Sequence, residues 1–171
     1  QGQVYDSYNI ASLWQLPVIF VIENNKYGMG TSVNRSSAGD NLSDRGKAYG
    51  IKSEIVDGMD IIAVREAAIK AIEYCRLGKG PYILEMKTYR YRGHSMSDPA
   101  KYRTRDEVEQ IRKTSDPIEN IKVLLNKMGV VDKVLKDIDV EIKSIIADAA
   151  KFAQDSPEPS PSELYTDITI N

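Results

Sequence analysis

The sequence predicts an α/β fold, with an open parallel sheet followed by C-terminal helices. Residues 18–22 are an unbroken run of β-branched and aromatic side chains, which is typical of a parallel-sheet strand covered on both faces. The order of predicted elements is helix, strand, strand, helix, strand, as expected for such a sheet. Polar loops at residues 23–30 and 89–99 follow two of the strands, and ligands bind beyond the carboxyl ends of strands in these folds.

The first helix is predicted at residues 3–16. Val4, Tyr8 and Ala11 fall on one face of that helix, as a helical period requires. Pro17 is expected to end it, because a proline cannot continue a helix. The strand that follows is predicted to lie in the centre of the sheet.

A connection rich in Ser, Asn and Gly comes next, with a short helix expected at residues 44–49. Residues 53–56 are predicted to form the second strand. Asp60 can cap a helix over residues 61–77, and Gly78 can close it. The apolar stripe of that helix comprises Val64, Ala68, Ala71, Ile72 and Cys75.

The third strand is predicted at residues 82–88. Its apolar side chains alternate with Glu85 and Lys87, which indicates a half-exposed strand near an edge of the sheet. Such alternation is typical of a strand with one face in water.

Helices are predicted from Thr104 onward. Thr104 with Glu107, and Asp116-Pro117 with Glu119, are two capping-box starts. A last helix begins near Val131 and carries one apolar face. That face comprises Ile138, Ile142, Ile145, Ile146, Ala149 and Phe152.

Composition bounds the function classes. The chain has 171 residues, enough for one globular domain that buries roughly 70% of its unfolded surface. Its net charge of −2 argues against a general nucleic-acid binder. No apolar run approaches the ~20 residues of a membrane span, so we do not expect a membrane protein. The single cysteine, Cys75, excludes an internal disulfide and fits a reducing compartment.

The chain opens at Gln1 in helix-like sequence, and we expect a fragment or processed product. Residues 1–155 are predicted to be part of one domain, and residues 156–171 a Pro-rich extended tail.

Two interpretations fit the loop at residues 23–30. Asparagines tolerate left-handed turns and glycines supply positive φ angles, so the loop can be a simple turn. Alternatively, the Asn25 side chain and a nearby carbonyl can ligate Mg²⁺, which prefers hard oxygen ligands and is often completed by phosphates. His94, the only histidine, is likewise either an exposed bystander or a functional group in a loop at a strand end.

Two segments carry a resemblance to a known family. Residues 23–32 (Glu-Asn-Asn-Lys-Tyr-Gly-Met-Gly-Thr-Ser) and residues 87–105, with the sequence Arg-Gly-His-Ser-Met-Ser-Asp-Pro inside them, resemble the alpha subunits of pyruvate dehydrogenases. The resemblance covers almost the whole chain, with weaker matches at residues 1–3, 8–9 and 14. It implies a thiamine-diphosphate-binding fold, incomplete at its N-terminus.

The resemblance assigns roles to particular residues. The Asn25 side chain and the Tyr27 carbonyl are implied Mg²⁺ ligands, and Gly28 and Arg90 implied contacts of thiamine diphosphate. His94 is implied to face the cofactor and to assist acyl transfer. The third protein ligand, the Asp of a Gly-Asp-Gly segment, is expected before Gln1, so we expect residues 1–171 alone to bind the cofactor poorly.

Ser95 matches a position that a dedicated kinase phosphorylates in mitochondrial relatives. A phosphate there adds about −1.5 to −2 charges. Four arginines are candidates to hold it: Arg90, Arg92, Arg103 and Arg105. An unmodified serine in a mobile loop is the other interpretation.

The resemblance also implies the reaction and the partners of the parent enzyme. It decarboxylates pyruvate and transfers the acetyl group to the lipoyl group of a dihydrolipoyl acetyltransferase. The implied assembly is an alpha-2-beta-2 heterotetramer, in the cytoplasm of a bacterium or the mitochondrial matrix of a eukaryote. Branched-chain 2-oxoacid and acetoin dehydrogenases share the fold, and a fragment inactive on its own is the remaining alternative.

Overall fold

The computed structural model describes residues 2–168. The chain divides into two compact units, Gln1–Ile121 and Lys122–Asn171, which are described separately. Residue 1 and residues 169–171, which include the end of the predicted tail, lie outside the described residues.

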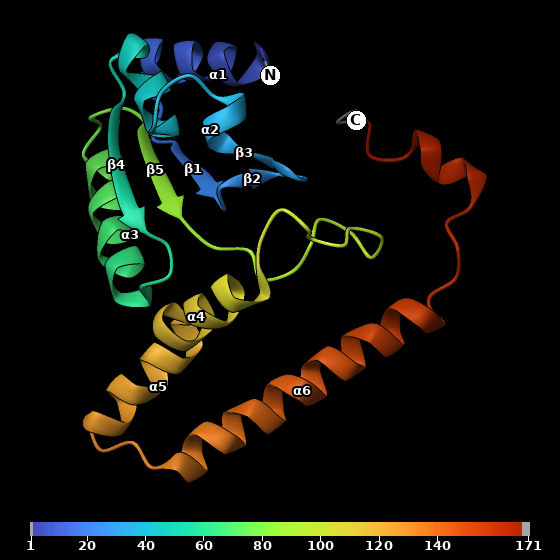
Figure 1. Ribbon diagram of the computed structural model, residues 1–171. Coiled ribbons are helices and arrows are strands. Elements are labelled where there is room, and N and C mark those ends of the chain that lie inside the picture. Colours follow the sequence, from blue (N-terminus) through green and yellow to red (C-terminus); the bar gives the residue numbers. More distant parts are fainter. Residues whose placement is uncertain (1, 169–171) are drawn as a thin grey trace. The chain divides into compact units, whose positions relative to one another are not determined.

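The first unit is built on a parallel sheet (Figure 1). Its three strands are β1 (Ile19–Asn24), β4 (Lys52–Asp57) and β5 (Tyr82–Lys87). Their order is β1-β5-β4, and both neighbouring pairs are parallel. The predicted α/β class and the three predicted strands are therefore confirmed.

The predicted positions of two strands within this sheet are wrong. β5 is the central strand, and its residues from Tyr82 to Met86 are buried. β1 pairs with β5 alone among the described strands, and Val21 on it is 60% exposed. Alternation misled the prediction for β5, because its one acidic residue, Glu85, is fully buried and hydrogen-bonded rather than solvated.

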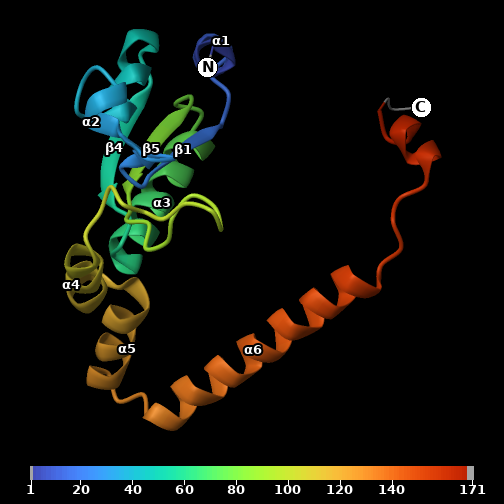
Figure 2. The same ribbon diagram turned by 45° about the vertical axis from the view of Figure 1, so that its right-hand side comes forward.

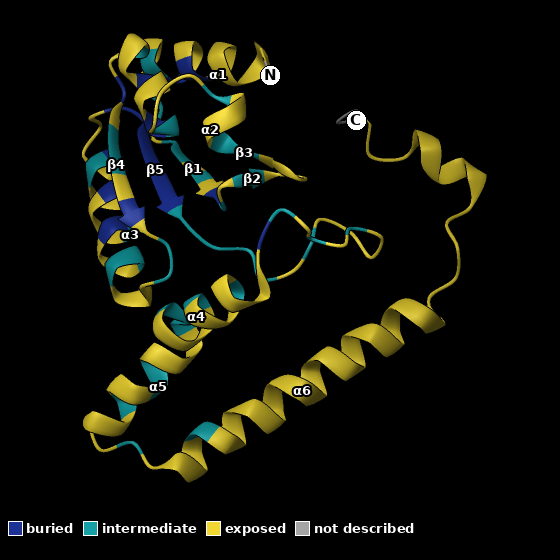
Figure 3. Ribbon diagram, viewed as in Figure 1, coloured by how far each residue is buried: buried dark blue, intermediate teal, exposed yellow. Residues whose placement is uncertain are grey.

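Helices cover both faces of the sheet (Figures 2 and 3). α3 (Ile61–Arg76) packs on one face, where Ala71 and Cys75 meet Leu84. α1 (Gly2–Leu13) and the 3-10 helix η1 (Leu42–Tyr49) lie on the other. The buried residues of this second face are Tyr8, Ile51 and Ile83, with Phe20, Ile22 and Tyr49 packed against them.

The predicted ends of the first helix need one correction. α1 ends at Leu13, well before Pro17, because the chain turns through Gln15 at φ 50°. The amide of Leu16 then donates to the carbonyl of Ala11 at 2.9 Å and closes the helix. The positive φ at Gln15, which no sequence pattern signals, decides this end.

The other helix boundaries follow the predicted caps. The Asp60 carboxylate accepts hydrogen bonds from two amides in the first turn of α3, at 2.9 and 3.1 Å. Thr104 Oγ1 accepts from the amide of Glu107 at 3.1 Å at the start of α4 (Arg105–Ser115). Asp116 caps α5 (Pro117–Lys127) in the same way.

The connection between β1 and β4 is more ordered than predicted. It holds a two-stranded hairpin of β2 (Tyr27–Gly28) and β3 (Thr31–Ser32), the short helix α2 (Val33–Ser36), and η1. A strand of two residues is too short to show the alternation of apolar and polar side chains that identifies a strand. The sequence therefore predicted an irregular loop. The predicted short helix at residues 44–49 is present as part of η1.

The second unit contains α6 (Asp132–Asp155) and the 3-10 helix η2 (Pro161–Tyr165). The predicted apolar face of α6 forms, but α6 is exposed along most of its length within the described residues (Figure 3). Ile142 and Ile145, for example, are each 52% exposed. η2 interrupts the tail that the sequence predicts to be extended. Among residues 2–168, no helix is both long enough and apolar enough to cross a membrane.

Replacing the buried carboxylate of β5 is expected to destabilise the fold strongly. Glu85→Ala leaves the Lys87 ammonium and two further donors without their acceptor, and such a loss costs about 3–5 kcal/mol. Urea unfolding of the variant measures it. Asp44→Ala, which removes an exposed ion pair with Lys47, is the matched control and should cost no more than about 1 kcal/mol. Equal losses in the two variants would contradict the expectation.

The same group gives the fold an acid-sensitive component. Burial opposes ionisation of Glu85, but hydrogen bonds from Lys87, Asn24 and Ser43 outweigh it and lower the pKa of the carboxyl to about 2. A lowered folded-state pKa contributes stability above the unfolded-state pKa of about 4.3. That contribution is lost as the pH falls from there towards 2, and Glu85→Ala should lose this part of the acid dependence.

Candidate functional site

The two predicted functional loops leave the sheet side by side. β1 and β5 are parallel and in register, with Asn24 opposite Lys87. The amide of Thr88 donates to the carbonyl of Asn24 at 2.9 Å, which continues the pairing one residue past the end of β5. The loops that begin at Asn25 and Thr88 therefore start at the same edge of the sheet.

A cavity of about 480 Å³ lies at this edge. Its lining residues are Glu23, Asn25, Thr88, Tyr89 and Arg90. The fold thus brings together Asn25 and Arg90, which are 65 positions apart in the sequence. Thr88 Oγ1 is buried and has no hydrogen-bond partner in the structure of residues 2–168, and buried hydroxyls without a partner are rare. The cavity therefore offers carboxylate and amide oxygens and a guanidinium to a polar ligand, and the buried Thr88 hydroxyl belongs to one of its lining residues.

Two hydrogen-bonded turns fix the asparagine pair. Asn24 Oδ1 accepts from the amide of Lys26 at 3.0 Å, and Asn25 Oδ1 accepts from the amide of Tyr27 at 3.1 Å. Asparagine favours such turns because its side chain can replace a backbone acceptor. Lys26, which lies between Asn25 and Tyr27, has a φ angle of 70°. An amide oxygen has two lone pairs, so Asn25 Oδ1 keeps one for another partner.

Positive φ angles in this loop do not fall on its glycines. They fall on Lys26 and Met29, whereas Gly28 pairs with Thr31 as part of the hairpin. Among the described residues, apart from Gly28 and its two chain neighbours, no heavy atom lies within 4 Å of the position that a Cβ at Gly28 would occupy. Packing within the described residues therefore does not require glycine here, and the surface above Gly28 is open.

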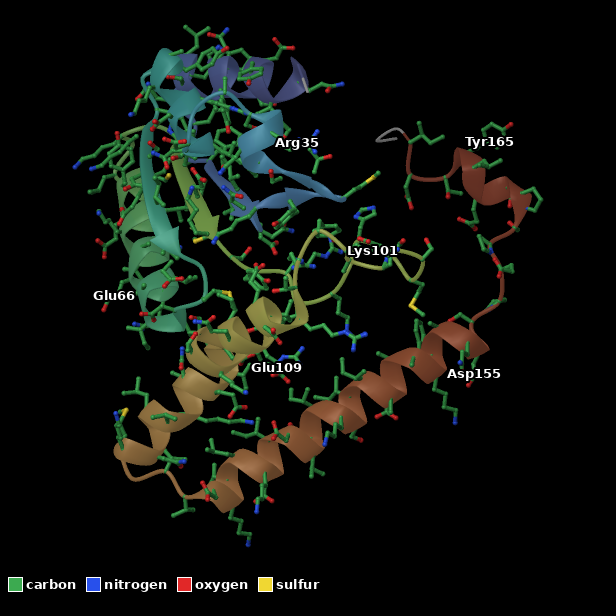
Figure 4. The ribbon with its side chains drawn as sticks, in the orientation of Figure 1. Arg35, Glu66, Lys101, Glu109, Asp155 and Tyr165 are labelled. Carbon is green, nitrogen blue, oxygen red and sulfur yellow. The ribbon has the colours of Figure 1, made fainter. Side chains whose placement is uncertain are left out.

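Asp98 organises the loop that carries His94. Asp98 Oδ2 accepts from the amide of His94 at 2.7 Å and from the Tyr102 hydroxyl at 2.9 Å, and Oδ1 accepts from the amide of Ala100 at 2.8 Å. The two amides, followed by the Tyr102 hydroxyl, lower the pKa of Asp98. The backbone of the loop is thus held from within, and Lys101, near its end, marks its place in Figure 4.

His94 itself is exposed, and it is not among the residues that line the 480 Å³ cavity. Its carbonyl lies 3.4 Å from a guanidinium nitrogen of Arg90, which does line that cavity. The fold therefore connects the His94 loop to the cavity through Arg90, while the imidazole is free to face a ligand or another chain.

The candidate modification site is accessible, but not all of its proposed arginines are. Ser95 is exposed, and its Oγ lies 3.0 Å from Ser97 Oγ. Arg103 is 8% exposed, and its guanidinium carbon lies 5.1–5.5 Å from three tyrosine rings. Those rings belong to Tyr27, Tyr89 and Tyr102. Arg103 also donates to the carbonyl of Arg92 at 3.0 Å. Its guanidinium therefore stabilises the backbone of the His94 loop.

Sequence reasoning missed the roles of four residues that shape this region. Glu85 and Arg103 are buried charges, Thr88 is an unsatisfied hydroxyl, and Asp98 is the centre of the His94 loop. Aspartate followed by proline is a turn signal and could have identified Asp98. The other three depend on partners distant in the sequence, which no local pattern shows.

Known relatives match the chain along its whole length. A pyruvate dehydrogenase E1 component subunit alpha from Rhizobium meliloti (strain 1021) is 59% identical over 171 residues, which are 99% of this chain and 49% of that protein. The corresponding subunit from Zymomonas mobilis is 54% identical over 170 residues, covering 99% of this chain and 48% of that protein. The somatic, mitochondrial form from Homo sapiens is 52% identical over 167 residues, which are 96% of this chain and 42% of that protein. The chain spans about half the length of these relatives.

The family comparison agrees with the individual relatives. The family described as dehydrogenase E1 component matches residues 1–162. That match includes the whole parallel sheet, the asparagine pair and the His94 loop. The chain therefore belongs to the dehydrogenase E1 component family.

Proposed function

We propose that this chain forms part of the thiamine diphosphate and Mg²⁺ site of a pyruvate dehydrogenase E1 component. The enzyme decarboxylates pyruvate and transfers the acetyl group to the lipoyl group of a dihydrolipoyl acetyltransferase. One observation carries the proposal: Asn25, Thr88 and Arg90 converge on one cavity at the carboxyl ends of two parallel strands. The names of the relatives, all pyruvate dehydrogenase alpha subunits, support pyruvate as the substrate.

The residues present fit a metal diphosphate. Asn25 Oδ1 and the Tyr27 carbonyl are hard oxygen ligands of the kind Mg²⁺ takes. Arg90 supplies a cation for the diphosphate, the Thr88 hydroxyl an unused hydrogen-bonding group, and Gly28 an open surface. Residues 2–168 contain no cluster of three or more His, Cys, Asp or Glu that could hold a metal ion, and the ligands that this loop would supply are an amide oxygen and a backbone carbonyl oxygen.

Within this chain, different residues are proposed to bind the cofactor and to transfer protons. Thiamine diphosphate supplies the carbanion chemistry of decarboxylation when bound. Asn25, Tyr27 and Arg90 hold and orient it. His94 can take or give a proton at a ring nitrogen during acetyl transfer, because its imidazole is exposed and its two ring nitrogens can accept or donate a hydrogen bond. Ser95, exposed beside it, is the proposed position for regulatory phosphorylation.

A second subunit completes the proposed site. His94 and Ser95 are exposed, and so is one apolar face of α6; exposed apolar surface of this kind marks protein interfaces. These features support a beta subunit as partner in an alpha-2-beta-2 enzyme. The corresponding compartment is the bacterial cytoplasm or, as the name of the human relative states for that protein, the mitochondrion.

Calorimetric titration tests this proposal. Thiamine diphosphate with Mg²⁺ is titrated into the intact protein, with and without the beta subunit, and pyruvate-dependent CO₂ release is measured on the same samples. We expect saturable binding and CO₂ release when both subunits are present. Saturable binding with turnover of a branched-chain 2-oxoacid instead of pyruvate would reassign the substrate. The absence of binding with both subunits present would contradict the proposal.

A further inference from the structure

Glu85 is a buried charge that the proposed chemistry does not use. It lies in the central strand β5, its side chain is fully buried, and it is not among the residues lining the 480 Å³ cavity. Its carboxylate accepts three hydrogen bonds of 2.8 Å, from Lys87 Nζ, Asn24 Nδ2 and the amide of Ser43. The ion pair with Lys87 already provides a charge partner, so the bond to Asn24 calls for a separate explanation.

The bond to Asn24 fixes the orientation of an amide. Asn24 Nδ2 donates to Glu85, which leaves Oδ1 on the opposite side to accept from the amide of Lys26 at 3.0 Å. The reverse orientation would place the amide oxygen against a carboxylate and the NH₂ group against an N–H donor. Glu85 therefore determines which group Asn24 presents to the loop.

Lys26 is the residue on which this orientation acts. It adopts φ 70°, a left-handed conformation that a lysine rarely takes without support. It also lies between Asn25 and Tyr27, so the direction of its peptide units sets where the Asn25 side chain and the Tyr27 carbonyl lie relative to each other. The path from Glu85 through Asn24 to Lys26 ends at the proposed metal ligands.

We propose that Glu85 and Asn24 are positioning residues that hold the loop of Asn25 and Tyr27 in the geometry that ligates Mg²⁺. The inference rests on the proposed function, because it concerns the same metal. Groups that orient metal ligands without touching the metal commonly control its affinity, and their loss weakens binding about 10–100-fold.

Binding of Mn²⁺ in place of Mg²⁺, followed by electron paramagnetic resonance, tests the inference on the intact protein with its beta subunit and saturating thiamine diphosphate. Asn24→Ala should weaken Mn²⁺ binding about 10–100-fold. Lys87→Gln removes a different partner of the same carboxylate and is the matched control; it should lower the melting temperature but leave the Mn²⁺ dissociation constant within about twofold, because the Asn24 bonds remain.

A second variant covers the case in which Asn24→Ala does not fold. Asn24→Asp keeps the size of the side chain and the acceptor for Lys26, but it places an oxygen against the Glu85 carboxylate. The same loss of Mn²⁺ affinity is expected, with recovery of pyruvate turnover at high Mn²⁺ concentration.

The possible outcomes separate this inference from the proposed function. If Asn25→Ala loses Mn²⁺ binding while Asn24→Ala and Asn24→Asp stay within twofold of wild type, the positioning role is overturned and the metal site stands. Equal loss of affinity in Lys87→Gln and Asn24→Ala, in proportion to their loss of melting temperature, would reduce Asn24 to a structural residue. A wild-type enzyme that binds no Mn²⁺ with the cofactor would overturn both proposals.

Discussion

His94→Ala is expected to slow acetyl transfer in the intact enzyme about 10²- to 10⁴-fold, the usual effect of losing a positioned acid or base. The melting temperature should hardly change. His94 is exposed, and the hydrogen bonds that hold this part of the loop use its backbone amide and carbonyl. Its removal leaves no core cavity, and surface changes usually stay within about 0.5 kcal/mol.

Turnover with a lipoyl acceptor and thermal unfolding, measured on the same preparation, decide this prediction. Met96→Ala is the matched control, because Met96 is fully exposed two positions further along the same loop. It should leave both quantities unchanged. Normal turnover in His94→Ala would make the histidine a bystander. A parallel collapse of turnover and melting temperature would make it structural.

Asn25→Ala should weaken the binding of thiamine diphosphate with Mg²⁺ by at least about 100-fold, because the proposed role of Asn25 is direct ligation and even indirect positioning groups contribute 10–100-fold. The loss should be specific to the metal complex. Asn25 also accepts from the amide of Tyr27, so a stability loss of about 1 kcal/mol is expected as well.

Calorimetry with thiamine diphosphate and Mg²⁺ measures this loss. Asn34→Ala changes an exposed asparagine in the nearby helix α2 and should bind the cofactor within about twofold of wild type. Equal affinities for the two variants would remove Asn25 from the metal site. A fall in melting temperature in proportion to the loss of affinity would indicate that Asn25 shapes the loop without ligating the metal.

The sequence predicted the elements of the fold better than their places in the sheet. The caps at Asp60, Thr104 and Asp116 depend on side chains within three residues of the amides they bind, so local sequence revealed them. β5 is central because it pairs with both β1 and β4, and its Glu85 is bonded there by Asn24 and Ser43, which lie far from it in the chain. The alternation of apolar and polar residues along a strand cannot distinguish a solvated glutamate from one that has buried hydrogen-bond partners.

The candidate site was likewise only partly predictable. The sequence placed Asn25 and Arg90 in loops that leave strand ends, and the family resemblance implied that both contact the same cofactor; in the structure they line one cavity. The sequence could not show that Thr88 contributes an unsatisfied hydroxyl or that Arg103 is enclosed by tyrosines. It also did not predict that His94 lies outside the residues lining that cavity. These features arise from contacts between segments whose relative register only the folded chain sets.

The position of the metal ion tests the central claim most directly. Crystals of the intact enzyme grown with thiamine diphosphate and Mn²⁺, with diffraction recorded at the manganese absorption edge, locate the ion without assumptions about its ligands. We expect one anomalous peak at the carboxyl ends of β1 and β5, about 2.1 Å from both Asn25 Oδ1 and the Tyr27 carbonyl oxygen. A peak that has neither atom as a ligand would contradict the assignment of this loop as the metal site.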